Sequence, residues 1–399
     1  MTKHINRSVS LELTLAFACC RWPRSKAGDA VVCAAASAAI DWDRFASIIA
    51  RNRISALAKD ALDRADIKPP ALIAAQLAHG QTKAAFNSLA QARESIRLQR
   101  AFDAAGLPAL IIKGAPLAML AYGDLGRKES WDIDLLTDEG SVLCARHLLE
   151  ELGYALSAPT NLNDTQFARW LPNSVEAAFH HAETGITMEL HWGLVDNDRL
   201  LAGVGSASEA QVVSLGPGNV KTLADAPLFA YLCVHGAAHN WSRLKWLADV
   251  GAFLGNRSVQ EVEQLYYTAY KLGSERPAGL ALLLCQRMLG LQLSPSVEKE
   301  LSGDRIIVAL FRNVLAGLEF GAGTAEHLSY TIPWWRVRIA CFFYGRGVAH
   351  VGRELKIAWT SPLDHAQLAL PSKLSFLYHI VRVPLWIFRL GMRIKRKAI

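Results

Sequence analysis

The sequence predicts an α+β protein in which a small mixed sheet is flanked by helical regions on its N-terminal and C-terminal sides. Short apolar runs of β type are concentrated between residues 106 and 195. Before and after this stretch, apolar side chains instead repeat every three to four positions, as in amphipathic helices. With 399 residues, the chain is long enough for two or three domains and a sizeable core.

Composition excludes several classes of protein. Hydrophobic residues make up 51% of the chain, which is too many for an intrinsically disordered protein. No uncharged apolar run reaches the length of about 18 residues that a transmembrane helix requires. The seven cysteines are scattered and form no CxxC pair. Dispersed cysteines of this kind are typical of reduced thiols, so we expect a cytoplasmic protein.

The basic charge is concentrated at the end of the chain. Removing the six basic groups of the last segment lowers the net charge from +7 to +1; they are Arg382, Arg389, Arg393, Lys395, Arg396 and Lys397. Nucleic acid is therefore not an expected partner, because no basic and aromatic stripe flanks the sheet region. Residues 376–399 form a basic amphipathic pattern that either contacts an anionic membrane surface or docks on its own domain.

The order of elements defines five regions. Residues 1–105 are predicted to be helical, with Asp41 capping a helix that carries Trp42. The α/β core follows at 106–195. Residues 196–226 are Gly/Ser-rich and predict an irregular linker. Residues 227–375 predict a C-terminal helical domain, with one strong helical segment from Leu228 to Phe253, and 376–399 form the basic tail.

Within the core, the pattern alternates strand and helix. An apolar run from Ala109 to Ile112 predicts a first strand, and Pro116 is well placed in the first turn of a helix over 115–122. A strand is expected at 132–136 and a helix at 141–152. Two β-type runs around a Gly-containing turn then predict a hairpin over 175–192.

Three acidic residues stand out in this core. Asp132 and Asp134 flank Ile133, and residues two apart on a strand face the same side. Two carboxylates so close repel each other unless a cation holds them. Glu189 alternates in the same way with Met188 and Leu190, so a neighbouring strand is expected to supply a third carboxylate. Oxygen ligands of this kind suit Mg²⁺.

These residues carry a resemblance to a known family. The matching segments are Lys113-Gly114, Arg127, Asp132-Ile133-Asp134-Leu135-Leu136 and Glu189-Leu190-His191-Trp192. They resemble the nucleotidyltransferase superfamily related to polymerase beta, and more closely the bacterial group called uncharacterised nucleotidyltransferases. The resemblance extends weakly over most of the chain. It implies a small mixed-sheet nucleotidyltransferase core that transfers a nucleoside monophosphate from a nucleoside triphosphate to a hydroxyl and releases pyrophosphate.

The resemblance also implies roles for individual residues. Asp132 and Asp134 are expected to bind Mg²⁺ or Mn²⁺, and Glu189 either completes the metal site or acts as the general base. The acceptor hydroxyl is unknown. His191 is expected to be either a polar contact near the site or a satisfied core histidine, and the second interpretation is favoured.

A second set of residues is expected to contact the nucleotide. Gly114 opens a helix whose backbone N–H groups favour phosphate, and Lys113 adds a point charge. Relatives often carry Gly-Ser at this position, whereas this chain has Gly114-Ala115. Arg127 resembles the arginine that precedes the acidic motif, but its spacing to Asp132 leaves Lys128 as a competing candidate.

Other hypotheses remain open. His235 and His239 are four residues apart and share a helical face, but the metalloprotease pattern requires a glutamate where Gly236 stands. Their stretch either joins helices by hydrogen bonds or binds nucleotide or acceptor. As a whole, the protein is expected to be a transferase, with two rivals. One is a catalytically degenerate nucleotide-binding member, and the other is a membrane-surface interaction protein organised by the basic tail.

Overall fold

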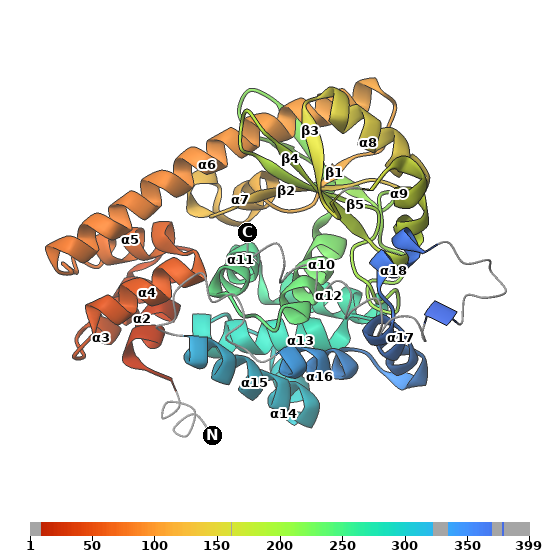
Figure 1. Cartoon of the computed structure of the whole chain (residues 1–399). Coiled ribbons are helices and arrows are strands. Elements are labelled where there is room, and N and C mark those ends of the chain that lie inside the picture. The colour runs from red at the N-terminus through yellow and green to blue at the C-terminus, as the bar shows by residue number, and fades with distance from the viewer. Residues whose placement is uncertain (1–8, 161, 322–333, 369–376, 379–399) are drawn as a thin grey trace, which may run out of the picture.

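A mixed sheet of five strands forms one side of the molecule (Figure 1). The computed structural model describes residues 9–160, 162–321, 334–368 and 377–378. The strand order is β1-β2-β5-β4-β3; β2 and β5 run parallel, and the other neighbours are antiparallel. The strands are β1 (Leu110–Ile111), β2 (Asp132–Leu136), β3 (Tyr154–Ala158), β4 (Glu176–His181) and β5 (Thr187–His191).

Helix α6 and the helices within the sheet region pack around this sheet, and four shorter helices precede α6. The long helix α6 (Ala71–Ala104) starts beside the N-terminal helices and runs past the sheet (Figure 1). The N-terminal helices are α2 (Leu11–Cys19), α3 (Lys26–Ala36), α4 (Trp42–Asn52) and α5 (Ser55–Arg64). The helices within the sheet region are α7 (Ala115–Tyr122), α8 (Val142–Glu151) and α9 (Asp164–Trp170), with short 3₁₀ turns η1 (Leu125–Arg127), η2 (Glu139–Ser141) and η3 (Leu171–Asn173).

The second half of the described chain is a helical assembly below the sheet in Figure 1. Its helices are α10 (Asp225–Ala238), α11 (Leu244–Gly255), α12 (Val259–Lys271), α13 (Glu275–Leu284), the π-helical η4 (Cys285–Leu289), α14 (Pro295–Gly303), α15 (Arg305–Gly321), α16 (Trp334–Tyr344), α17 (Gly347–Trp359) and α18 (Pro362–Gln367). The predicted α+β class, with a small mixed sheet flanked by helical regions, is therefore confirmed.

Two hydrophobic cores hold these layers together. One lies between the sheet and the helices α6, α8 and α9. The larger core joins the N-terminal helices α2, α4 and α5 to α10–α15, so residues from opposite ends of the chain are buried against one another. Asp41 caps α4, as predicted, by accepting a hydrogen bond from the backbone N–H of Arg44 at 3.0 Å. The N-terminal helices therefore share one hydrophobic core with the helical assembly.

Most elements of the predicted core are confirmed. Helix α7 and strand β2 have the predicted bounds, and the predicted hairpin is formed by β4 and β5. Strand β3 was not predicted. Its segment, Tyr154–Ala158, follows α8 directly and pairs with β4 at the edge of the sheet.

The prediction of an irregular linker over 196–226 is wrong in its second half. Strands β6 (Ala210–Ser214) and β7 (Asn219–Leu223) form an antiparallel hairpin there. Val213 and Val220 of this hairpin are buried in the sheet-side core. The Gly-Pro-Gly sequence that indicated a loop is only the turn between the two strands.

The predicted single helical segment from Leu228 to Phe253 is divided into α10 and α11. Asn240 and Trp241 have φ values of 49° and 48°, which end α10 and redirect the chain. The Trp241 side chain is fully buried and packs against Gly236, where a Cβ would come within 2.5 Å of the indole. The chain therefore changes direction between α10 and α11, and the Trp241 indole packs back on the last turn of α10.

Among the described residues, no helix is long and apolar enough to cross a membrane. The basic tail, for which membrane contact was one hypothesis, lies almost entirely outside the described residues.

Candidate active site

The two acidic strands lie side by side in register. In the parallel pair of β2 and β5, Asp134 stands opposite Glu189, and Asp132 stands opposite Thr187. Ile133 and Leu135 point the other way and are buried in the sheet-side core. The alternation predicted for β2 therefore places Asp132 and Asp134 on one face, next to the carboxylate of Glu189.

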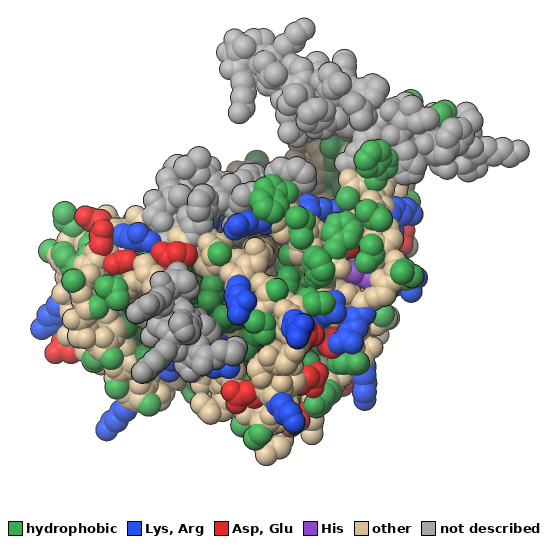
Figure 2. All heavy atoms as spheres, turned by 90° about the horizontal axis from the view of Figure 1, so that it is seen from below, with side chains coloured by type: hydrophobic (Ala, Val, Ile, Leu, Met, Phe, Trp, Pro, Cys, Tyr) green, Lys and Arg blue, Asp and Glu red, His purple; other side chains and the backbone are tan. Residues whose placement is uncertain are grey.

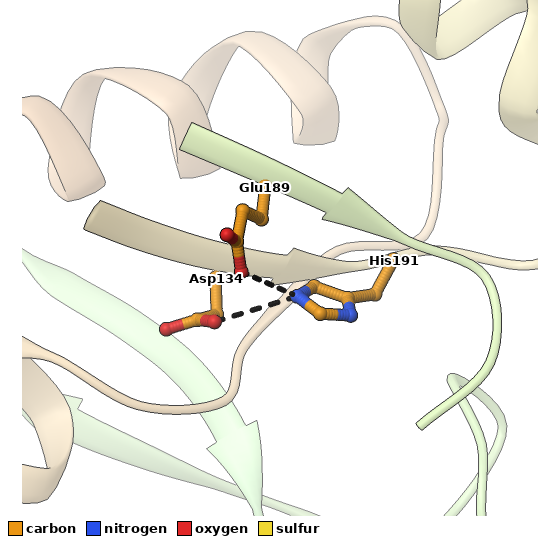
Figure 3. A group of neighbouring side chains, drawn as sticks. All are labelled: Asp134, Glu189 and His191. Atoms are coloured by element: carbon orange, nitrogen blue, oxygen red, sulfur yellow. Dashed lines mark ion pairs between the residues drawn. The ribbon is translucent and has the colours of Figure 1, made fainter. Parts of the chain in front are cut away.

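His191 completes this group. Its Nε2 lies 3.4 Å from Asp134 Oδ1 and 3.6 Å from Glu189 Oε2, and its Nδ1 lies 3.3 Å from Glu176 Oε2. Figure 3 shows Asp134, Glu189 and His191 converging from the two neighbouring strands. One ligand atom from each of these three residues lies within 4.8 Å of the others, so the group could hold a metal ion. His191 is thus a polar member of the site and not the core histidine that was favoured.

Lys113 binds the most deeply buried carboxylate. Its Nζ lies 2.7 Å from Asp134 Oδ1, and the Asp134 side chain is 2% exposed. Burial by itself would raise the pKa of Asp134, but the Lys113 ammonium and the His191 imidazole hold it below its usual range. Burial would lower the pKa of His191, yet its contacts to Asp134 and Glu189 raise it to about 9. At neutral pH the site therefore contains two cations around Asp134.

Asp132 differs from Asp134 in the charges that surround it. Burial raises the pKa of Asp132, and the charge of Asp134 raises it further, while Lys113 opposes the shift. Asp132 lies in the wall of the same cavity, but it does not belong to the tight group of Asp134, Glu189 and His191. The negative charge of Asp132 is therefore less compensated by nearby cations than that of Asp134.

A cavity of about 650 Å³ lies in front of these carboxylates. Its sheet side includes Gly114, Asp132, Asp134, Glu176, Glu189 and His191. Four cationic residues from three regions of the chain also line it and are here called the cationic wall, Arg53, Lys128, Arg243 and Lys245. Further lining residues come from the segment after β5 and from α16 and α17, such as Asp196, Asn197, Arg338, Tyr344 and Glu354.

Lys245 is the most perturbed cation of this wall. Burial, together with the nearby charges of Lys128 and Arg53, lowers its pKa to about 7, while Asp132 and Asp249 oppose this shift. No sequence pattern marked Lys245 or Arg53, because each becomes part of the site only through the packing of α4 and α11 beside the sheet.

The structure places only some of the predicted nucleotide-contacting residues at the cavity. Gly114 is the N-terminal cap of α7 with a φ of 66°, a conformation that favours glycine, and it lines the cavity together with Lys113. Arg127 does not line the cavity; its guanidinium contacts Asp60 at 2.8 Å and Asp124 at 3.0 Å. Lys128 does line it. Of the two competing candidates, Lys128 is the one at the cavity.

Lys128 also joins the sheet region to the helical assembly. Its Nζ lies 2.5 Å from Asp249 Oδ2, and the Tyr122 hydroxyl donates to Asp249 Oδ1 at 3.0 Å. All three side chains are buried. Asp249 therefore has the helix-joining role that was one of the two hypotheses for this stretch.

The histidines of α10 lie at the cavity as well. The rings of His235 and His239 are 4.7 Å apart, and His239 stacks on Trp246 at 4.9 Å. Burial holds the pKa of His235 well below its usual value, so this ring is neutral. Both histidines and Trp246 line the cavity, where His239 and Trp246 form a stacked pair and His235 meets Trp246 edge to face.

Together, these features define an α+β protein whose paired strands present carboxylates to a cavity with one cationic wall. The chain belongs to the family described as uncharacterised nucleotidyltransferases, whose model matches residues 38–290. The match contains the sheet, the carboxylates and the cationic wall, and it ends before α14–α18. No curated protein and no solved structure matches the chain.

Proposed function

We propose that this protein transfers a nucleoside monophosphate from a nucleoside triphosphate to a hydroxyl group and releases pyrophosphate. The observation that carries the proposal is the register of β2 and β5, which brings Asp134 and Glu189 face to face, beside Asp132, at a cavity with a cationic wall. Family membership supports the same class of reaction. The proposal extends the sequence resemblance to the superfamily related to polymerase beta.

The acidic residues fit a divalent cation such as Mg²⁺ or Mn²⁺. Asp134 and Glu189 offer oxygen ligands within 4.8 Å of each other and of a His191 nitrogen, and Asp132 adds a carboxylate to the same cavity. Carboxylates suit both ions, and an imidazole nitrogen among the ligands favours Mn²⁺ over Mg²⁺. When bound, such a cation supplies charge stabilisation to the reacting phosphoryl group.

The cationic wall suits the triphosphate. Lys128, Lys245 and Arg53 come from different elements and converge on the same part of the cavity. Gly114 places the N-terminus of α7 at the cavity, and backbone N–H groups at a helix start favour phosphate. We expect these groups to hold the phosphate chain, and the stacked pair of His239 and Trp246 offers an aromatic partner for the base.

The transfer step then balances in atoms and charge. The acceptor hydroxyl oxygen forms a bond to the α-phosphorus, and the bond from that phosphorus to the oxygen bridging to the β-phosphate breaks. Pyrophosphate leaves with the electron pair of the broken bond. Glu189, whose side chain is 30% exposed in the cavity wall, is placed either to accept the hydroxyl proton or to hold the cation beside it.

The test is incubation of the full chain with each of the four ribonucleoside triphosphates, Mg²⁺ or Mn²⁺ and a cell extract. We expect metal-dependent pyrophosphate release together with a nucleotidylated product, and both should be lost in Asp132→Ala. Asp103→Ala is the matched control, since Asp103 does not line the cavity and contacts Lys221 and Gln99 on a half-exposed surface. Activity that persists in Asp132→Ala would overturn the proposal.

A second candidate is a member that binds nucleotide without transferring it. The Lys113–Asp134 ion pair favours this alternative, because an ammonium already neutralises the carboxylate that a metal would use. Nucleotide binding measured by calorimetry, without pyrophosphate release under any of the conditions above, would support the binding protein over the enzyme.

A further inference from the structure

Helices α16 and α17 have an unusual distribution of side chains. Their inner faces line the cavity with both polar and apolar side chains, Val337, Arg338, Cys341 and Tyr344 on α16 and Glu354 and Ile357 on α17. A helix at the surface of a globular protein normally directs its apolar stripe inward and only polar side chains into water. The outer faces of both helices therefore need an explanation.

Each outer face is an apolar stripe at helical spacing. On α16, the exposed fractions are 48% for Trp335, 51% for Ile339 and 45% for Phe343, which are four residues apart. On α17, the stripe consists of Val348 (91%), Val351 (39%), Leu355 (57%) and Trp359 (55%). Residues three or four apart lie on one side of a helix. These seven side chains form one exposed apolar stripe on each helix, and together they are called the α16–α17 apolar face.

Basic side chains outnumber acidic ones on these two helices. Between residues 334 and 359 the basic residues are Arg336, Arg338, Arg346, Arg353 and Lys356. The acid in this range, Glu354, is 5% exposed and lines the cavity. Arg346 pairs with Glu275, Arg353 pairs with Asp198, and Arg336 lies over the ring of Trp335. Figure 2 views the molecule from below and shows hydrophobic side chains gathered on this side, with Lys, Arg, Asp and Glu between them.

An apolar surface of this kind marks a site of interaction. A second copy of the chain would bring the same basic residues against one another, because a two-fold interface uses the same patch on both subunits. Tryptophan and phenylalanine flanked by Lys and Arg instead match the interface of an anionic lipid bilayer. We propose that the α16–α17 apolar face docks on an anionic membrane surface.

Docking by this face has a consequence for the cavity. The inner sides of the same two helices form part of the cavity lining. Docking by their outer faces therefore holds that part of the cavity lining next to the lipid surface. The inference concerns residues 335–359, which lie outside the family match, and it does not depend on transferase activity.

The test is co-sedimentation of the full chain with vesicles of phosphatidylcholine alone and of phosphatidylcholine mixed equally with phosphatidylglycerol. The double variant Val348→Asp/Leu355→Asp places two carboxylates in the apolar face. Its matched control is Leu72→Asp/Phe86→Asp on α6, where both side chains are also exposed, at 79% and 76%. The basic tail is unchanged in both variants, so it cannot account for a difference between them.

We expect the wild type and the α6 control to bind the anionic vesicles, and the α16–α17 variant to bind them at least about tenfold more weakly. Lys356→Glu is a second variant that leaves the apolar side chains intact, and it should weaken binding to anionic vesicles. Circular dichroism melting checks that each variant is folded. Equal binding by wild type and the α16–α17 variant, equal binding to neutral and anionic vesicles, or loss of a dimer in the variant without any vesicle binding would each overturn the proposal.

Discussion

Asp134 on β2 stands directly opposite Glu189 on β5, in a parallel strand pair whose register brings two acidic side chains to the same cavity. Like charges on neighbouring strands are destabilising unless a cation lies between them. Lys113 and His191 provide that compensation in the structure, with Nζ at 2.7 Å and Nε2 at 3.4 Å from Asp134 Oδ1. The site is therefore built to hold positive charge.

Substitution of Glu189 should lower the rate of catalysis more than it lowers the stability of the fold. We expect Glu189→Gln to lower the rate of pyrophosphate release by roughly a hundredfold or more, whether Glu189 binds the cation or accepts the proton. The Glu189 side chain is 30% exposed, so the free energy of unfolding of the protein should change little in this variant. Steady-state kinetics measures the first effect and urea denaturation the second. A rate within a few fold of wild type would remove Glu189 from the reaction.

Substitution of Asp134 should instead destabilise the fold. Asp134→Ala leaves the Lys113 ammonium and the His191 imidazolium without their shared partner, and breaking a buried pair costs roughly 3–5 kcal/mol. The double variant Lys113→Met/Asp134→Leu should cost less than the sum of its single changes, because no charge is stranded. Urea denaturation of the four proteins in this cycle measures the difference. Additive costs would show that the two residues do not depend on each other.

The affinity for a divalent cation should rise with pH. His191 has a pKa of about 9 in the metal-free site, so it carries a proton at neutral pH that repels a cation and blocks its ring nitrogen. Raising the pH towards about 9 removes this proton and should strengthen Mn²⁺ binding, as measured by calorimetry. In His191→Gln the dependence on pH should be much weaker. A pH slope as steep as that of the wild type in this variant would assign it to another group.

The affinity for nucleotide should show the opposite trend. The pKa of Lys245 is lowered to about 7, so its ammonium loses its proton as the pH rises through this value, and the attraction to a triphosphate weakens. The charges facing it are those of Lys128, Arg53, Asp132 and Asp249. A bound triphosphate favours the protonated amine, which shifts the loss of affinity to higher pH.

Two variants isolate this effect. Lys245→Arg keeps its charge at all accessible pH values and should bind nucleotide equally well on both sides of neutrality. Lys245→Met should bind weakly throughout, by about tenfold if the interaction contributes 1.4 kcal/mol. Fluorescence titration with a labelled nucleotide in the absence of divalent cations measures both. A wild-type pH profile in Lys245→Met would show that Lys245 is not the titrating group.

Prediction from sequence was most successful where local chemistry is decisive. The alternation of Asp132, Ile133 and Asp134 predicts a strand with two faces, and Pro116 after Gly114 predicts the start of α7. Both are properties of a few neighbouring residues, namely the two-residue period of a strand and the backbone preferences of glycine and proline. The hairpin of β4 and β5 followed from the same kind of pattern.

Predictions that needed distant partners were less successful. Trp241 looks like one more apolar residue of a helix, yet it is fully buried in the core that joins both ends of the described chain, and the chain turns at Asn240 and Trp241. Arg127 and Lys128 are adjacent, and only the positions of Asp60 and Asp249 show that Arg127 is bound away from the cavity while Lys128 lines it. His191 could have been assigned to the site from its spacing of two from Glu189 on the same strand.

By itself, the sequence determined which side chains share a face of each strand and helix, because these periods depend on backbone geometry alone. It thereby determined the acidic pair on β2 and the class of fold. Only the tertiary structure decided that Glu189 stands opposite Asp134 with His191 beside it, that Arg53 and Lys245 join the cationic wall, and that α16 and α17 turn apolar sides outward. Strand register, helix packing and burial depend on contacts between residues far apart in the chain, which no local pattern records.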